Sequence, residues 1–146
     1  MCWSNKRKIF KRSYRRISKK NKKYNHIEIV EVKDEGLVEK VKELKLEEEK
    51  ILKHLNEKDY IITLEIEGTE ITSEEFAKKI DNVLIENSNI TFIIGGSYGL
   101  SNAIKEKAKY HLSFSKLTFP HQLFRVLLLE QIYRSYKINN NENYHK

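Results

Sequence analysis

The strongest constraint on the fold lies in the last third of the chain, where an apolar run leads straight into a glycine-rich turn. Residues 90–94 form a short, largely apolar segment typical of a buried strand, and a Gly-Gly-x-x-Gly turn follows at 95–99. Residues 112–125 suggest a short strand, a polar loop, and Pro120 at the start of a long apolar helix. Because such turns expose backbone N–H and C=O groups, these segments predict a nucleotide-like ligand held mostly by main chain.

Strand-like and helix-like segments alternate along the whole chain. Apolar runs and period-two patterns predict strands at 26–32, 60–66, 90–94 and 112–115; helical spacing predicts helices at 6–20, 37–55, 72–85, 101–109 and 120–136. Thr72 and Glu75 fit a capping box, and Ser101 is expected to cap the helix after it. The expected core positions of the 37–55 and 72–85 helices are Leu37, Val41, Leu44, Ile51, Leu52, Leu55, Phe76, Ile80 and Val83. This order predicts an α/β fold, with a mainly parallel sheet and helices on both faces.

Length and composition predict one soluble domain covering residues 1–146. No apolar run approaches the roughly 18 residues of a membrane span, so no membrane partner is expected. The start carries no apolar signal region, and a cytoplasmic protein is the simplest interpretation. A single cysteine, Cys2, excludes an internal disulfide and predicts no metal cluster.

The net charge of +7 is concentrated at one end of the chain. Residues 1–24 hold eleven of the 28 Lys and Arg residues and no acid, which leaves 17 basic against 21 acidic residues elsewhere. Such a block suggests contact with RNA phosphates, although a solvated basic arm or helix face is the more general interpretation of a charge run.

Five segments, taken in order, resemble a known family. They are Thr63-Leu-Glu-Ile-Glu-Gly68, Phe92-Ile-Ile-Gly-Gly96 with Gly99-Leu-Ser101, Leu112 through Arg125, Glu130-Gln-Ile-Tyr-Arg134, and Tyr144-His-Lys146. Together they resemble the small SPOUT-class (knotted) methyltransferases of the large ribosomal subunit, in particular the family that methylates ring nitrogen-3 of a pseudouridine in 23S rRNA. The resemblance runs from about Tyr14 to Lys146.

The resemblance implies a C-terminal trefoil knot, which no periodicity could reveal and which breaks the usual rule against threading. It places the cofactor-binding knot region at 60–146 and makes residues 1–24 an atypical basic segment. It also implies a homodimer that acts on 23S rRNA in the assembled ribosome, with each active site built from both chains. The helix at 123–133 is apolar almost all round, so it is either a central core helix or partly covered by a second subunit.

S-adenosyl-L-methionine is the cofactor that the resemblance implies. The glycine spacing fits neither the dinucleotide fingerprint nor a P-loop, which argues against NAD and ATP. The residues that match the family's cofactor contacts are Leu64, Gly95, Gly96, Phe114, Ser115, Lys116, Leu117, Thr118 and Phe119. Leu64, Leu117 and Phe119 would flank the adenine. Taken singly, each apolar residue fits plain core equally well, and the glycines fit an ordinary tight turn.

The resemblance also places the terminal Tyr-His-Lys over the active site. His145 and His121 are the candidate proton acceptors by residue type, and Tyr144 could stack on the base. Arg125 is a candidate for reaching cofactor or RNA. His121 is expected to be structural, and Arg134 is expected either to function in the site or to pair with Glu130.

The start of the chain departs from the family pattern. Relatives begin with a Met-Lys-Ile type strand, for which the residues before Tyr14 leave no room, so the sheet is expected to have an unpaired edge or a gap. A misassigned or frameshifted start, or a degenerate protein, would explain it. Two hypotheses therefore compete with an active methyltransferase: an inactive RNA- or ribosome-binding protein of the same fold, and a generic nucleotide-binding α/β domain.

Overall fold

A computed structural model describes residues 13–32 and 39–143, which form two compact units. One unit comprises residues 29–71 and 82–118, and the other collects residues up to 28, 72–81 and 119 onward. After a helix at 13–21, the elements are α2 (Lys40–His54), β1 (Tyr60–Glu70), α3 (Ser73–Glu86), β2 (Ile90–Ile94), α4 (Asn102–Lys107), β3 (Tyr110–Ser113) and α5 (His121–Asn139). That the whole chain is one domain stays a prediction.

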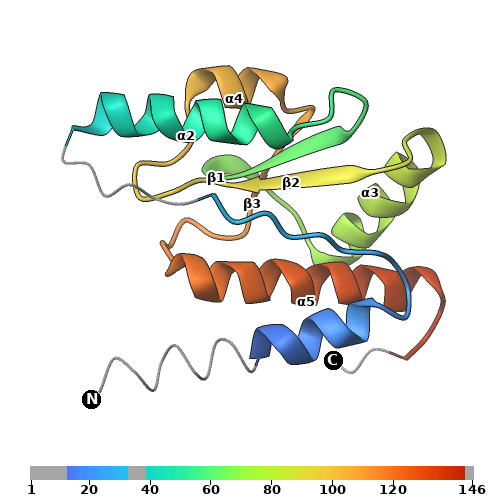
Figure 1. Cartoon of the computed structure of the whole chain (residues 1–146). Helices are drawn as coiled ribbons and strands as arrows, with labels where there is room; N and C mark the ends of the chain where they lie inside the picture. Colours follow the sequence, from blue (N-terminus) through green and yellow to red (C-terminus); the bar gives the residue numbers. More distant parts are fainter. Residues whose placement is uncertain (1–12, 33–38, 144–146) are drawn as a thin grey trace, which may run out of the picture. The chain divides into compact units, whose positions relative to one another are not determined.

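The first unit contains a three-stranded sheet in the order β2-β1-β3 (Figure 1). Both neighbours run parallel to β1: Tyr60 pairs with Ile90, and Ile62 pairs with Tyr110. The buried run 61–64, which has three apolar residues out of four, suits the central place of β1, because the strands of a parallel sheet are mostly buried and apolar. The predicted α/β class with a parallel sheet is confirmed.

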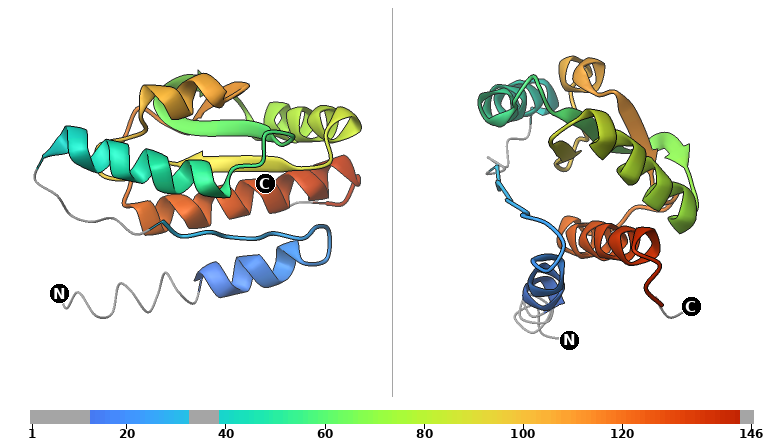
Figure 2. Two further views of the ribbon diagram at one scale, coloured as in Figure 1. Left: turned by 45° about the horizontal axis from the view of Figure 1, so that its top comes forward. Right: turned by 90° about the vertical axis from the view of Figure 1, so that its right-hand side faces the viewer.

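Two helices cover one face of this sheet. α2 and α4 lie side by side over it in the views of Figures 1 and 2. Their shared core brings together buried residues of α2, β1, β2 and the start of α4: Ile51, Ile61, Ile93, Leu100 and Ile104. This packing holds α4 on the same face of the sheet as α2.

Strand β1 passes the same residue of β3 twice. Leu64 and Thr69 both pair with Leu112, and the ladder is irregular between them. Gly68 lies in this irregular stretch, where a Cβ atom would stand 2.7 Å from the backbone carbon of Leu112 and 2.9 Å from that of His111. Glycine therefore permits a close approach of two backbones, the usual meaning of glycine inside a strand.

Local capping signals are confirmed in the structure. The Thr72 backbone N–H donates to Glu75 Oε2 at 2.7 Å and the Glu75 N–H donates to Thr72 Oγ1 at 3.2 Å, as a capping box requires. The Thr72 N–H bond, assisted by the Thr72 side chain, lowers the pKa of Glu75. Ser101 caps α4 by accepting the Ile104 N–H at 3.3 Å.

Several predicted boundaries are wrong. Residues 26–32 form no regular strand, because no described residue provides a ladder for them. Val41 was expected in the core but is 73% exposed on α2. β1 continues to Glu70 and β3 begins at Tyr110, while Pro120 caps α5 rather than starting it. The early part of the predicted 6–20 helix, with Ile9 and Phe10, and Leu37 lie outside the described residues.

The second unit is built from helices. The helix at 13–21 lies alongside α5 (Figure 2) and is tied to it by Asn21, which is fully buried and donates from Nδ2 to Leu129 O at 3.1 Å. The first part of α3 is bound to α5 by two contacts. Ser73 Oγ donates to Gln131 Oε1 at 2.8 Å, and Asn139 Nδ2 donates to Ala77 O at 2.9 Å.

We expect Gly68→Ala to lower the free energy of unfolding by about 1–3 kcal/mol, because the new methyl group meets backbone that cannot turn aside. Chemical denaturation measures the change. Gly96→Ala is the matched control: the atoms nearest to its Cβ would be those of the Glu47 carboxylate, at 2.9 Å from Oε1, and a side-chain tip can move. Equal losses in the two variants would contradict the explanation.

Candidate functional site

The three parallel strands bring the predicted cofactor segments to one edge of the sheet. Leu64, in the central strand, pairs with Ile94 on one side and with Leu112 on the other. Gly95 follows Ile94 directly, and the loop at 114–118 follows the end of β3. Ligands of open α/β sheets bind outside this carboxyl edge. The register thus places three segments from distant parts of the sequence at one level.

The turn after β2 is closed by its own backbone. The Gly99 N–H donates to Gly96 O at 3.1 Å, and Gly99 has a φ of +82°, which a residue with a Cβ rarely adopts. A Cβ on Gly95 would stand 2.6 Å from the Gly99 backbone. The Glu47 side chain of α2 lies against Gly96. The turn is therefore compact, with no side chain on three of its residues.

The loop at 114–118 is tied to β1 through one carbonyl. Ser113 Oγ and Lys116 Nζ both donate to Ile66 O at 3.1 Å. Within the loop, the Leu117 N–H donates to Ser115 Oγ at 3.0 Å. These bonds hold the main chain while the Leu117 side chain remains 71% exposed. An apolar side chain presented to solvent on a tethered loop is available to cover a ligand.

The remaining predicted site residues belong to the helical unit or lie outside the described residues. Phe119 and Arg125 belong to the helical unit, where the Phe119 ring lies 6.2 Å from that of Phe124. Tyr144 and His145 lie outside the described residues, as does Lys146. Arg134 pairs with Glu130 at 3.7 Å, as its spacing allows.

A polar cluster beside the edge was not predicted from the sequence. Thr63 Oγ1 donates to Glu65 Oε1 at 2.6 Å, and His111 Nδ1 lies 2.8 Å from both oxygens. Because the single hydroxyl proton of Thr63 goes to Glu65, His111 Nδ1 carries the proton it shares. Lys105 of α4 pairs with Glu65 Oε2 at 2.9 Å. The available signal was the alternation of polar Thr63 and Glu65 with Leu64 in a buried strand.

This cluster holds Glu65 in its charged form. Burial raises the pKa of Glu65, but hydrogen bonds from Thr63, Lys105 and His111 together lower it below its ordinary value of 4.5. The cluster therefore links α4 and β3 to the central strand through one carboxylate. The cluster stabilises the edge, and its bonds form within the protein without a ligand.

The helical unit anchors the chain after α5. Tyr24 donates its hydroxyl proton to the Glu142 carboxylate, with both oxygens at 3.0 Å, and its ring stacks on Tyr136 at 5.9 Å. Lys137 also donates to Glu142, which lowers the pKa of Glu142 and raises that of Lys137. The chain is thus fixed two residues before Tyr144.

Comparison with known proteins agrees with this geometry. Residues 2–145 match the family described as "Predicted SPOUT methyltransferase". The chain belongs to the SPOUT methyltransferases. The match covers all of the described sheet, turn and helices, so the edge described above is part of a SPOUT methyltransferase domain.

Relatives within this family are close and of similar length. A protein of Methanococcus maripaludis, provisionally named ribosomal RNA large subunit methyltransferase H, is 53% identical over 97% of this chain and 93% of its own. Ribosomal RNA large subunit methyltransferase H of Caldicellulosiruptor saccharolyticus is 46% identical over 97% and 94%. Ribosomal RNA large subunit methyltransferase H 1 of Clostridium perfringens is 45% identical over 97% and 93%. The chain belongs to this large-subunit methyltransferase H family.

The described residues contain neither a cluster of metal ligands nor a helix that could span a membrane. Within residues 13–32 and 39–143, no group of three or more His, Cys, Asp or Glu side chains is arranged to hold a metal ion. Among the same residues, every helix is too short or too polar to cross a membrane.

The Glu65 cluster predicts a specific acid dependence of stability. Since the folded-state pKa of Glu65 is lowered, its contribution is fully present above the ordinary value of 4.5 and is lost as pH falls through the folded value. We expect Glu65→Gln to lower the free energy of unfolding at pH 7 by about 1–3 kcal/mol and to flatten its decline below pH 4.5. Denaturation across this pH range measures both effects.

The exposed Glu67 gives the control for this prediction. Glu67→Gln should leave the pH dependence as in the wild type. If Glu65→Gln keeps the full acid decline, the cluster does not carry it.

Proposed function

We propose that the chain is an S-adenosyl-L-methionine-dependent methyltransferase that modifies N3 of a pseudouridine in 23S rRNA, on assembled ribosomes. The observation that carries the cofactor part is the shared register of Leu64, Ile94 and Leu112, which aligns three segments at one sheet edge. The names of the relatives supply the rRNA substrate class. The nucleotide and its ring position rest on the resemblance to the pseudouridine-modifying family.

The residues at this edge suit the chemistry of the cofactor. Adenine needs an apolar cover and backbone partners for its polar rim, and the edge offers Leu117 with the main chain of the 95–96 turn and the 114–118 loop. Main-chain groups bring no net charge. They therefore leave the positive sulfonium without a competing cation at the turn.

Each proposed contact has a distinct task. Leu64, Gly95, Gly96 and residues 114–119 would bind and orient the cofactor, which supplies an electrophilic methyl group when bound. Arg125 would position substrate or cofactor. Tyr144 would stack on the acceptor base, and His145 would take the ring-nitrogen proton. Holding the acceptor in line with the methyl group is then the main catalytic contribution of the protein.

The family also supports proposals about assembly and topology. A trefoil knot through the 60–146 region and a homodimer with composite sites both follow from the resemblance. α5 supports the dimer, because its apolar residues Leu123, Phe124 and Leu127 are only half-buried. A cytoplasmic location fits a substrate carried by ribosomes.

A second candidate is an inactive RNA- or ribosome-binding protein of the same fold. It is favoured by residues 26–32, which have strand-like alternation but join no ladder among the described residues. Methyl transfer separates the two, since only an active enzyme transfers the methyl group of S-adenosyl-L-methionine.

The decisive experiment is transfer of a radiolabelled methyl group from S-adenosyl-L-methionine to ribosomes that lack the native modification. Nuclease mapping then locates the label. We expect label on one pseudouridine of 23S rRNA. Cofactor binding without transfer would support the binding-only protein. The absence of both binding and transfer would exclude a cofactor site at this edge.

Leu117→Ser tests the cofactor edge without disturbing the fold. Because Leu117 is 71% exposed, the substitution should leave the free energy of unfolding nearly unchanged. Loss of its contact with adenine should weaken cofactor binding about tenfold, as calorimetry would show. The matched control is Ile85→Ser on α3, where an apolar side chain is 77% exposed away from the edge. Equal affinity in the two variants would remove Leu117 from the site.

A further inference from the structure

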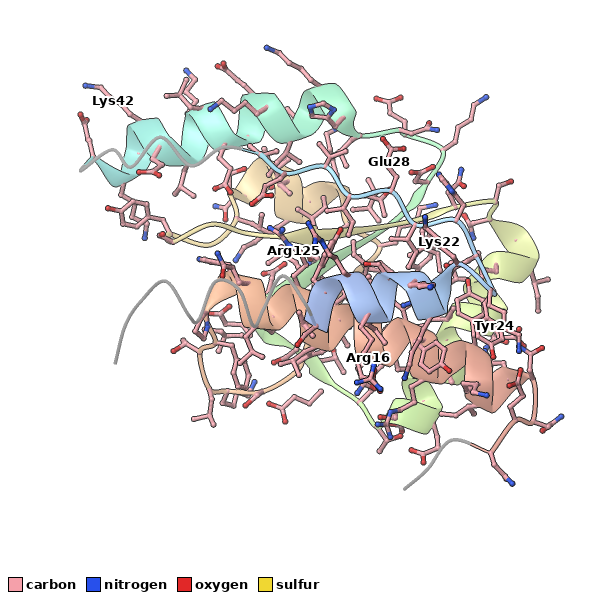
Figure 3. The ribbon with its side chains drawn as sticks, turned by 60° about the horizontal axis from the view of Figure 1, so that its bottom comes forward. Arg16, Lys22, Tyr24, Glu28, Lys42 and Arg125 are labelled. Carbon is pink, nitrogen blue, oxygen red and sulfur yellow. The ribbon has the colours of Figure 1, made fainter. Side chains whose placement is uncertain are left out.

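The helix at 13–21 and the turn after it carry an unbalanced positive charge. Residues 13–24 contain no Asp or Glu. Their cations are all exposed: Arg15, Arg16, Lys19, Lys20, Lys22 and Lys23. Figure 3 shows Arg16 and Lys22 on this segment. We call these six side chains the basic face.

The basic face is held on a fixed support. Ile17 is 5% exposed and Asn21 fully buried, on the opposite side of the same helix. Asn21 bonds both Ile17 O and Leu129 O at 3.1 Å. Lys20 lies 5.1 Å from the centre of the Tyr133 ring and Lys23 lies 5.3 Å from that of Tyr24. The face is therefore presented by a docked helix rather than by a free arm.

The arrangement of charge opposes the stability of the helix. Within the helix, Arg15 and Lys19 are four residues apart, as are Arg16 and Lys20, and like charges at this spacing repel. Among the described residues, Arg15, Arg16, Lys19 and Lys22 make no ion pair with a carboxylate. Helix α2 differs, because its lysines alternate with glutamates and Lys42 pairs with Glu39 at 2.7 Å. A helix whose like charges repel one another is stabilised most by binding a polyanionic partner.

The chemistry of the face selects RNA as that partner. Arginine and lysine together match phosphate oxygens. The four cations of the helix span about 8 Å from Arg15 to Lys20, and Lys22 and Lys23 extend the row into the turn, so the row can follow a phosphate backbone. A membrane-binding helix would also present apolar residues, but Ile17 is buried against the protein. An acidic protein would need a specific complementary pattern, whereas phosphates need only the charge.

We propose that the basic face is the docking surface for the phosphate backbone of the RNA substrate. This inference rests on the proposed rRNA methyltransferase function and names the surface that supplies its affinity. The face provides sequence-independent binding and shares no residue with the cofactor edge formed by Leu64, the 95–96 turn and the 114–118 loop.

The test removes four charges that have no partner among the described residues. The variant carries Arg15→Gln, Arg16→Gln, Lys19→Gln and Lys22→Gln. The control removes four exposed charges of α2 by Lys40→Gln, Lys42→Gln, Lys45→Gln and Lys53→Gln. Both variants change the net charge equally, so a difference between them reports position rather than total charge.

Binding to a 23S rRNA transcript is measured against KCl concentration. We expect the basic-face variant to bind about 10- to 100-fold more weakly near 100 mM salt, with a salt slope smaller by roughly 3 to 4. The α2 control should keep at least most of the wild-type affinity and slope. The basic-face variant should also melt at a temperature equal to or above that of the wild type, because repulsion within the helix is relieved. Its affinity for S-adenosyl-L-methionine should not change.

Three outcomes would overturn the proposal. A wild-type salt slope of RNA binding in the basic-face variant would show that RNA docks elsewhere. Equal losses of RNA affinity in the basic-face variant and the α2 control would show that only the net charge matters. Loss of binding to vesicles containing phosphatidylserine, with RNA binding intact, would assign the face to a membrane.

Methyl transfer separates this proposal from the function on which it rests. If the wild type methylates ribosomes and the variant shows a raised KM for RNA with an unchanged kcat, both proposals stand. Transfer that is identical in wild type and variant rejects the docking surface alone. Salt-dependent RNA binding through the basic face without any transfer rejects the enzyme while keeping the surface.

Discussion

The arrangement of the candidate site depends on the pairing of one strand. β1 holds four consecutive buried residues, Ile61 to Leu64, and pairs in parallel with a neighbour on each side. The pairing of Leu64 with Ile94 and with Leu112 sets where the neighbouring strands end relative to it. A slip of one residue would turn each side chain of a strand to the opposite face and shift the turn and the loop against each other. The position of the proposed cofactor segments is therefore a consequence of core packing.

Local signals in the sequence predicted much of this fold. The capping box at Thr72 and the cap at Ser101 depend on residues three apart, and both are present. The strand at 90–94 was predicted with its observed bounds. The predicted strand at 26–32 is wrong because a strand depends on distant residues. Alternation shows only that a segment could lie in a sheet, while a strand exists only if a partner supplies a ladder. Ile29 and Val30 accordingly remain exposed.

The site could be predicted only in part for the same physical reason. The glycine turn was identifiable from the sequence because glycine spacing is a local feature, and the 114–118 loop was identifiable through the family resemblance. Their common level was not, since it arises from pairing between residues 30 to 48 positions apart. The cluster of Thr63, Glu65 and His111 was missed, because its members meet only once β1 and β3 are side by side.

Charge is distributed in this chain against the local preference of the helix that carries it. A helix with like charges four residues apart loses stability, and Gln or Glu at some of these positions would relieve it. The helix nevertheless forms, because Ile17 and Asn21 are buried and a bond from Asn21 to Leu129 ties it to α5. Tertiary contacts thus restore the stability that repulsion between the like charges takes from the helix. Such a conflict between local and global preference is expected where a surface serves binding rather than folding.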